Sequence, residues 1–196
     1  MQTEIEAKFL NIDHEAMRAK LRGLGAKLQQ PMRLMRRKNF DFPNLELEKN
    51  GGWVRLRDEG NKITLSYKQL TDRSLLGTKE VSVEVSDFEG TEQFLLAIGL
   101  TQQSYQETKR ESWLLDRTEV ELDEWPWVRT YLEVEGPSEE DVIHAARKLG
   151  LNWADAKHGS VEIVYQAEYD ITDQEVDHWP KITFTKIPAE LEAKRI

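Results

Sequence analysis

Hydrophobic and polar residues alternate along many short segments of the chain, and the first of these lies near the N-terminus. Successive side chains of an extended strand point to opposite faces, so Glu4, Glu6 and Lys8 share one face. The apolar residues between them share the other face. The same alternation predicts further strands at residues 54–57, 64–68, 80–85, 119–123 and 132–135.

The polar face of these strands is unusually rich in charge. Alternation of this kind most often marks an antiparallel sheet with one solvated face, where Thr, Ser and Gln are also common. Here several strands instead carry short arrays of Arg, Lys or Glu. A barrel with a charged interior and an apolar exterior would use such a pattern well. The pattern therefore suits an α+β fold in which a closed antiparallel β-barrel has helices packed on its outside.

Three helices are expected, each directly after a strand that carries glutamate. Asp13 can cap the first, whose apolar stripe extends to Leu28. The second follows Asp87, and the third follows Ser138, which can form a capping box with Asp141. Glycine-containing segments predict turns at 50–52 and 59–61 and a loop at the barrel mouth at 73–78.

Composition excludes several classes of protein. The net charge of −9 argues against a general nucleic-acid binder, which normally carries a basic excess. No apolar run approaches the roughly 18 residues of a membrane span, and the N-terminus lacks the features of a signal peptide. With no cysteine, neither a disulfide nor a thiol nucleophile is available. A cytoplasmic protein that binds neither nucleic acid nor membrane is expected, and its oligomeric state is not indicated.

The order of several charged motifs resembles that of the CYTH superfamily, also called triphosphate tunnel metalloenzymes. Glu4-Ile5-Glu6-Ala7-Lys8 is similar to the ExExK signature of that family. The later matches, in family order, are Arg55-Leu56-Arg57, Leu65-Ser66-Tyr67-Lys68, Lys109-Arg110, Glu133-Val134-Glu135 and the segment from Lys157 to Tyr165. The resemblance implies a tunnel domain at residues 1–170. Residues 171–196 would form a C-terminal extension packed on or capping the barrel, with a strand at 182–187 and a helix at 188–196.

The resemblance also implies a tunnel that binds a small-molecule triphosphate together with Mg²⁺ or Mn²⁺. Arginine suits phosphate because its planar fork donates two hydrogen bonds, and lysine serves as a compact charge. The cations assigned to the substrate are Lys8, Arg55, Arg57, Lys68, Arg110 and Lys157. Carboxylates in the same cavity would repel the substrate unless a hard cation lay between them. The assigned metal ligands are Glu4, Glu6, Glu133 and Glu135, with Glu84 and Glu121 as second candidates that could equally form salt bridges to tunnel cations.

Three functions remain open at this stage. The first is metal-dependent hydrolysis of inorganic triphosphate, a nucleoside triphosphate or thiamine triphosphate, with Lys8 as the catalytic residue that meets the reacting phosphate or orients the water. The second is a class IV adenylyl cyclase, and the third is a non-catalytic phosphate-binding protein. Hydrolysis is favoured because it needs only a positioned water. The basic run formed by Arg33, Arg36, Arg37 and Lys38 is expected to be solvated, although it could draw an anionic substrate toward one mouth of the tunnel.

Overall fold

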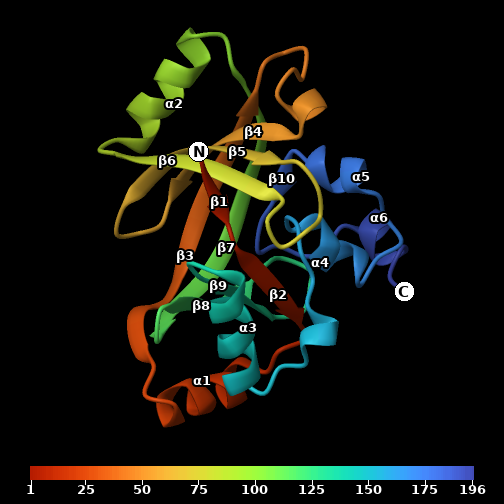
Figure 1. Ribbon diagram of the computed structural model, residues 1–196. Helices are drawn as coiled ribbons and strands as arrows, with labels where there is room; N and C mark the ends of the chain where they lie inside the picture. Colours follow the sequence, from red (N-terminus) through yellow and green to blue (C-terminus); the bar gives the residue numbers. More distant parts are fainter.

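The computed structural model describes every residue from Met1 to Ile196 and contains one sheet of ten strands (Figure 1). The sheet follows the order β1-β6-β5-β4-β3-β7-β8-β9-β2, and β10 pairs with β7 outside this path. The strands are β1 (Gln2–Glu4), β2 (Glu6–Leu10), β3 (Lys27–Asp41), β4 (Gly52–Asp58), β5 (Ile63–Leu70), β6 (Thr78–Val85), β7 (Thr101–Leu115), β8 (Thr118–Glu124), β9 (Tyr131–Glu135) and β10 (Lys181–Ile182).

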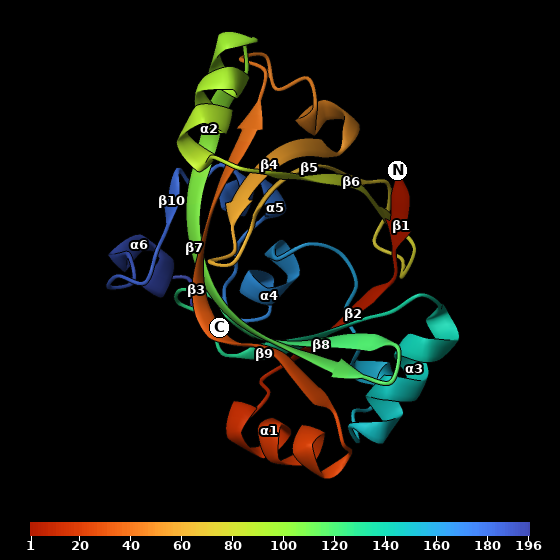
Figure 2. The ribbon, with the colours of Figure 1, turned by 90° about the vertical axis from the view of Figure 1, so that its left-hand side faces the viewer.

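The N-terminal segment joins the two edges of this sheet. β1 pairs antiparallel with β6, whereas β2, which follows after Ile5, pairs antiparallel with β9. These partners lie at opposite ends of the remaining strand order, so one short stretch of chain bends the sheet into a ring (Figure 2). The predicted antiparallel barrel with helices outside is confirmed, in a nearly closed form.

The three predicted helices pack on the outer surface of the barrel (Figure 1). They are α1 (His14–Gly23), α2 (Phe88–Ala97) and α3 (Glu139–Lys148). The side chains of Asp13, Asp87 and Ser138 accept hydrogen bonds from backbone N–H groups in the first turns, as the capping pattern predicts. None of the helices in the molecule is long and apolar enough to cross a membrane.

The first helix is shorter than its apolar stripe predicted. It ends at Gly23, and Gly25 adopts a positive φ of 76°, a conformation that terminates helices and reverses the chain. Leu28 therefore lies in β3, where it is about half exposed, instead of on the buried face of α1. The predicted turns at 50–52 and 59–61 form as expected, with positive φ at Gly51 and Gly60.

The apolar core lies between the strands and the helices and leaves the barrel interior to polar side chains. The largest buried cluster lies beneath α1 and α3 and includes Phe9, Leu21, Leu132 and Val142. A smaller cluster beneath α2 contains Phe40, Leu56, Phe88, Leu95 and Leu100. Because Leu56 faces α2, its neighbours in β4 face the interior of the barrel.

The C-terminal segment forms a third apolar cluster with the barrel. The segment contains α4 (Glu162–Gln166), α5 (Asp173–Asp177), β10 and α6 (Ala189–Glu192). Tyr165, Tyr169 and Ile182 are fully buried there against Trp125 and Tyr131 of the barrel. The strand predicted at 182–187 is limited to Lys181–Ile182, which pairs in parallel with β7, and only residues 189–192 of the predicted terminal helix are helical.

We expect the C-terminal segment to contribute directly to the stability of the barrel. Ile182→Ala should lower the free energy of unfolding by about 2–5 kcal/mol, because it removes a fully buried side chain and leaves a cavity. Ile196→Ala is the matched control, since the side chain of Ile196 is 78% exposed. Equal urea midpoints for the two variants would show that the segment folds independently of the barrel.

Candidate active site

The interior of the barrel holds a cavity of about 1030 Å³. Most of the sequence-predicted residues line it: Glu4, Glu6, Lys8, Arg55, Arg57, Lys68, Arg110, Glu121, Glu133 and Glu135. Two predicted residues do not. Glu84 is exposed near the end of β6, and the side chain of Lys157 is exposed while its backbone pairs with that of Lys8. The cavity also extends to Glu162 and Val176 in the C-terminal segment.

Strand pairing sets the order of charges on one wall of the cavity. Lys8 on β2 lies opposite Glu133 on β9, and Glu133 lies opposite Glu121 on β8. Two residues away along the same strands, Glu6 lies opposite Glu135, and Glu135 lies opposite Glu119. The spacing of two in the ExExK segment is thus repeated across three neighbouring strands.

Lys8 and Glu133 form the centre of this wall. The Nζ atom of Lys8 lies 2.6 Å from Glu6 Oε1 and 3.2 Å from Glu133 Oε1. On the other side of Glu133, Arg110 Nη2 lies 2.5 Å from Glu133 Oε2 and 2.6 Å from Asp123 Oδ2. Burial would lower the pKa of Lys8, but Glu133 and Glu6 outweigh it and hold this pKa above its ordinary value. Burial likewise opposes ionisation of Glu133, yet Lys8 and Arg110 keep its pKa below the usual range.

A second charge network lies near the junction of β1 and β6. Lys68 Nζ lies 2.7 Å from Glu4 Oε2 and 3.3 Å from Glu80 Oε2, and Arg55 Nη2 lies 3.2 Å from Glu80 Oε1. Burial, followed by a hydrogen bond with Glu80, raises the pKa of Glu4. Burial opposes ionisation of Glu80 as well, but its hydrogen bond with Glu4 and the charges of Arg55 and Lys68 hold the pKa of Glu80 below its usual range. Of the two carboxyl groups, Glu4 is therefore the one that binds a proton more readily.

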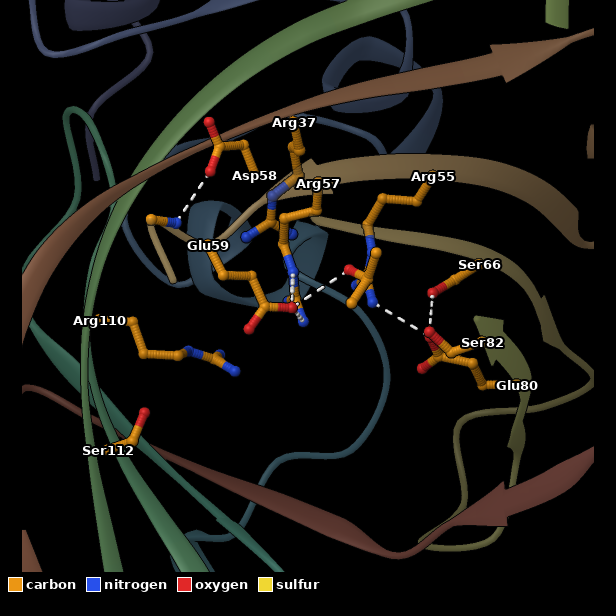
Figure 3. A network of polar contacts seen from close by, with 12 residues as sticks. Arg37, Arg55, Arg57, Asp58, Glu59, Ser66, Glu80, Ser82, Arg110 and Ser112 are labelled. Carbon is orange, nitrogen blue, oxygen red and sulfur yellow. Dashed lines mark hydrogen bonds and ion pairs between the residues drawn. The ribbon is translucent and has the colours of Figure 1, made fainter. Parts of the chain in front are cut away.

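A third network surrounds Arg57 (Figure 3). Its Nη2 lies 2.6 Å from Glu59 Oε1, which also accepts a hydrogen bond from Thr64. Glu59 was predicted to lie in a turn, with no role at the site. Because Glu59 follows β4 directly, its side chain returns into the barrel and pairs with the arginine two residues earlier.

The expectation that the basic run is solvated is wrong for half of its members. Arg33 and Arg37 line the cavity, whereas Arg36 pairs with Asp58 and Glu89, and Lys38 pairs with Glu92 of α2. The run lies in β3, which alternates between the interior and the outer surface. No site role was predicted for Glu80 and Asp123, although Glu80 lies four residues before Glu84 and Asp123 two residues after Glu121, on the same strand faces.

One edge of the cavity has the donor chemistry of a divalent-cation site. Glu6, Glu135 and Glu119 lie on three adjacent strands, and burial followed by the charges of Glu6 and Glu119 raises the pKa of Glu135 to about 7. Carboxylate oxygens are the preferred ligands of hard cations such as Mg²⁺ and Mn²⁺. No three acidic or histidine side chains are already gathered closely enough to hold a metal. The carboxylates present therefore fit such an ion chemically, and Glu6 would have to exchange Lys8 for it.

Comparison with known proteins identifies the family. A family model described as the CYTH domain matches residues 2–158, which is most of the chain. The protein belongs to the CYTH domain family. Members of this family are triphosphatases or cyclases, and its tunnel enzymes use divalent metal ions. No curated protein matches the sequence.

Several solved structures share the CYTH fold. The PH1012 protein of Pyrococcus horikoshii OT3 is 24% identical, with a TM-score of 0.68 over 82% of this chain and 98% of that chain. A candidate adenylate cyclase of Vibrio parahaemolyticus is 15% identical, with a TM-score of 0.73 over 84% and 98%. A Hippeastrum protein, described as a candidate adenylyl cyclase with a dominant triphosphatase activity, is 17% identical, with a TM-score of 0.59 over 84% and 95%.

Glu121 should make the stability of the empty CYTH barrel depend on pH. Burial, only partly offset by Arg110, raises its pKa to about 7. Between about pH 4.5 and about pH 7, the folded state holds a proton on Glu121 that the unfolded state has lost. The free energy of unfolding therefore falls as the pH rises through this range. Glu121→Gln, which stays neutral, should raise the thermal midpoint at about pH 8, by about 2–4 °C per kcal/mol gained, and less at about pH 5.

Glu84→Gln is the control for this pH series, because Glu84 is an exposed glutamate of the same barrel. Its midpoint should follow that of the wild type at every pH. A profile for Glu121→Gln that runs parallel to the wild type would show that Glu121 ionises normally.

Proposed function

We propose that the protein is a divalent-metal-dependent triphosphatase that hydrolyses a small-molecule triphosphate inside the barrel. The observation that supports this most is the set of strand cations that face a single cavity together with carboxylates. These cations are Lys8, Arg33, Arg37, Arg55, Arg57, Lys68 and Arg110. A phosphate chain is the ligand that matches so many convergent donors, since arginine forks and lysine charges both bind phosphate oxygens.

The charge balance of the cavity supports exchange of partners on binding. Within the barrel, Lys8 pairs with Glu6 and Glu133, and Lys68 pairs with Glu4 and Glu80. An anionic substrate would take over the lysines, which frees carboxylates for a cation. The carboxylates that would hold the metal are Glu4, Glu6, Glu133 and Glu135, with Glu119 beside them. A divalent ion bound there would supply charge stabilisation for the attacking and leaving oxygens.

Lys8 is the residue that we assign to the reacting phosphate. It lies between Glu6 and Glu133 at the centre of the charged wall, and its side chain is almost completely buried. The raised pKa of Lys8 keeps it protonated, so it can donate hydrogen bonds to a phosphate oxygen or orient the attacking water. Phosphoryl transfer depends mainly on such positioning and charge stabilisation.

Hydrolysis by water is favoured over a covalent route. The chain has no cysteine, and no serine lies in the strand–turn–helix setting of a nucleophile elbow. A neighbouring carboxylate can accept the proton that the water loses as it attacks the terminal phosphorus in line. The Hippeastrum protein, which shares the fold, is described as having a dominant triphosphatase activity. This description supports hydrolysis over cyclisation.

The decisive assay for this proposal compares products. Phosphate release from inorganic triphosphate, ATP and thiamine triphosphate should be measured with Mg²⁺ or Mn²⁺, together with chromatography for cyclic AMP. We expect release of the terminal phosphate, loss of activity in EDTA and recovery when the cation is restored. Cyclic AMP as the dominant product of ATP would replace this proposal with a cyclase, and full activity after EDTA and dialysis would remove the metal from it.

Lys8→Ala provides the control for a contaminating phosphatase. Phosphate release should fall by about a hundredfold or more, a typical loss when a residue that acts on the reacting group is removed. Affinity for the substrate should fall less, because several other cations of the cavity remain. Phosphate release that is unchanged in Lys8→Ala would assign the activity to another residue or to a contaminant.

A further inference from the structure

Arg37 differs from every other strand cation in the cavity. Each of the others has a carboxylate oxygen within 4.0 Å, including Arg33, whose Nη2 lies 4.0 Å from Glu59 Oε2. Arg37 has none, although only 8% of its surface is exposed. A buried charge without a counter-ion costs free energy, and proteins rarely keep one without a use for it.

The hydrogen bonding of Arg37 is also incomplete. Its single hydrogen bond runs from Nη2 to Thr108 Oγ1 at 3.2 Å, so Nε and Nη1 have no partner within the protein. The guanidinium stacks on the ring of Trp125, with 4.7 Å between its carbon and the ring centroid. This stacking holds the plane of the fork in place while two of its nitrogens stay unused.

Other unsatisfied polar atoms lie close to Arg37 in the wall of the cavity. Arg37 on β3 pairs with Arg57 on β4, and Arg55 lies beside them (Figure 3). The next inward-facing pair of these strands is Asn39 with Arg55. Arg55 Nε, Asn39 Oδ1 and Trp125 Nε1 are buried without a hydrogen-bond partner. All of these residues line the cavity. Most of the unpaired buried polar atoms of the molecule are thus gathered at one part of the barrel wall.

We infer that Arg37, held against Trp125 and flanked by Arg55, forms an oxyanion subsite that binds a phosphoryl group of the substrate. This subsite lies outside the motifs that mark the rest of the tunnel, and it rests on the proposed function only in taking a phosphate chain as the ligand. A phosphoryl oxygen would supply the missing counter-charge and accept hydrogen bonds from the free guanidinium nitrogens. Burial and the charges of Arg55, Arg57 and Arg110 all lower the pKa of Arg37, which means that its positive charge is unfavourable there. A bound anion would offset this cost.

The test uses Arg37→Met, which keeps an unbranched side chain against Trp125 and removes the charge. Binding of inorganic tripolyphosphate should be measured by calorimetry in EDTA, so that affinity is read without turnover. We expect affinity to fall by about tenfold or more, the usual effect of losing a charge-assisted hydrogen bond. The thermal midpoint of the empty protein should stay the same or rise, because an uncompensated buried charge has been removed.

Arg36→Met is the matched control, since it removes the same charge one residue away on the outer face of β3. Its affinity for tripolyphosphate should equal that of the wild type. Arg37→Lys is the second variant; it keeps a charge but not the fork, and should bind more weakly than the wild type while remaining folded.

Two results would overturn the subsite. One is wild-type affinity in Arg37→Met; the other is a sharp fall in the thermal midpoint of both Arg37 variants, or their failure to fold, which would make Arg37 a structural residue. If the wild-type protein itself binds no tripolyphosphate, the failure belongs to the proposed function as well. Wild-type binding with unaltered Arg37→Met would reject the subsite alone.

Discussion

Mutual compensation of charges within the barrel is the constraint on which the rest of the structure depends. Isolated ions are expensive to remove from water, so a protein that lines its interior with arginine, lysine and glutamate must pair them closely. Lys8 with Glu133 and Lys68 with Glu4 show this pairing. The same pairs block a preformed metal site, because the carboxylates already have cationic partners. A substrate and a metal ion that arrive together could replace both halves of each pair without leaving an ion exposed to an apolar wall.

The closure of the barrel explains why the charged wall lies where it does. The N-terminal segment pairs with β6 through β1 and with β9 through β2, so Glu4 and Glu6 reach different networks although they are two residues apart. Glu4 contacts Lys68 and Glu6 contacts Lys8. The interruption at Ile5 thus lets one short motif serve both edges of the sheet. Helices cover the outer surface, which frees the interior for chemistry.

Alternation with a period of two, together with the order of the charged motifs, was enough to predict the barrel, and most of the site residues assigned in this way line its cavity. Alternation worked for residues 4–8 and for residues 54–57 of β4, where charged and apolar residues strictly alternate. It failed for Arg37, because the neighbouring Arg36 and Lys38 are also charged and the pattern of β3 gives no inner face. Glu59 and Lys157 lie outside the strands, so their side-chain positions depend on how loops return to the barrel. Such positions follow from three-dimensional packing and have no local signal.

A crystal structure with Mn²⁺ and a nitrogen-bridged, non-hydrolysable triphosphate would test the central claim most directly. Anomalous diffraction locates manganese without reference to the protein. The account predicts manganese inside the barrel among Glu6, Glu133 and Glu135, with Lys8 turned from Glu6 to a phosphate oxygen. Manganese and triphosphate bound outside the barrel, with the internal ion pairs intact, would contradict it.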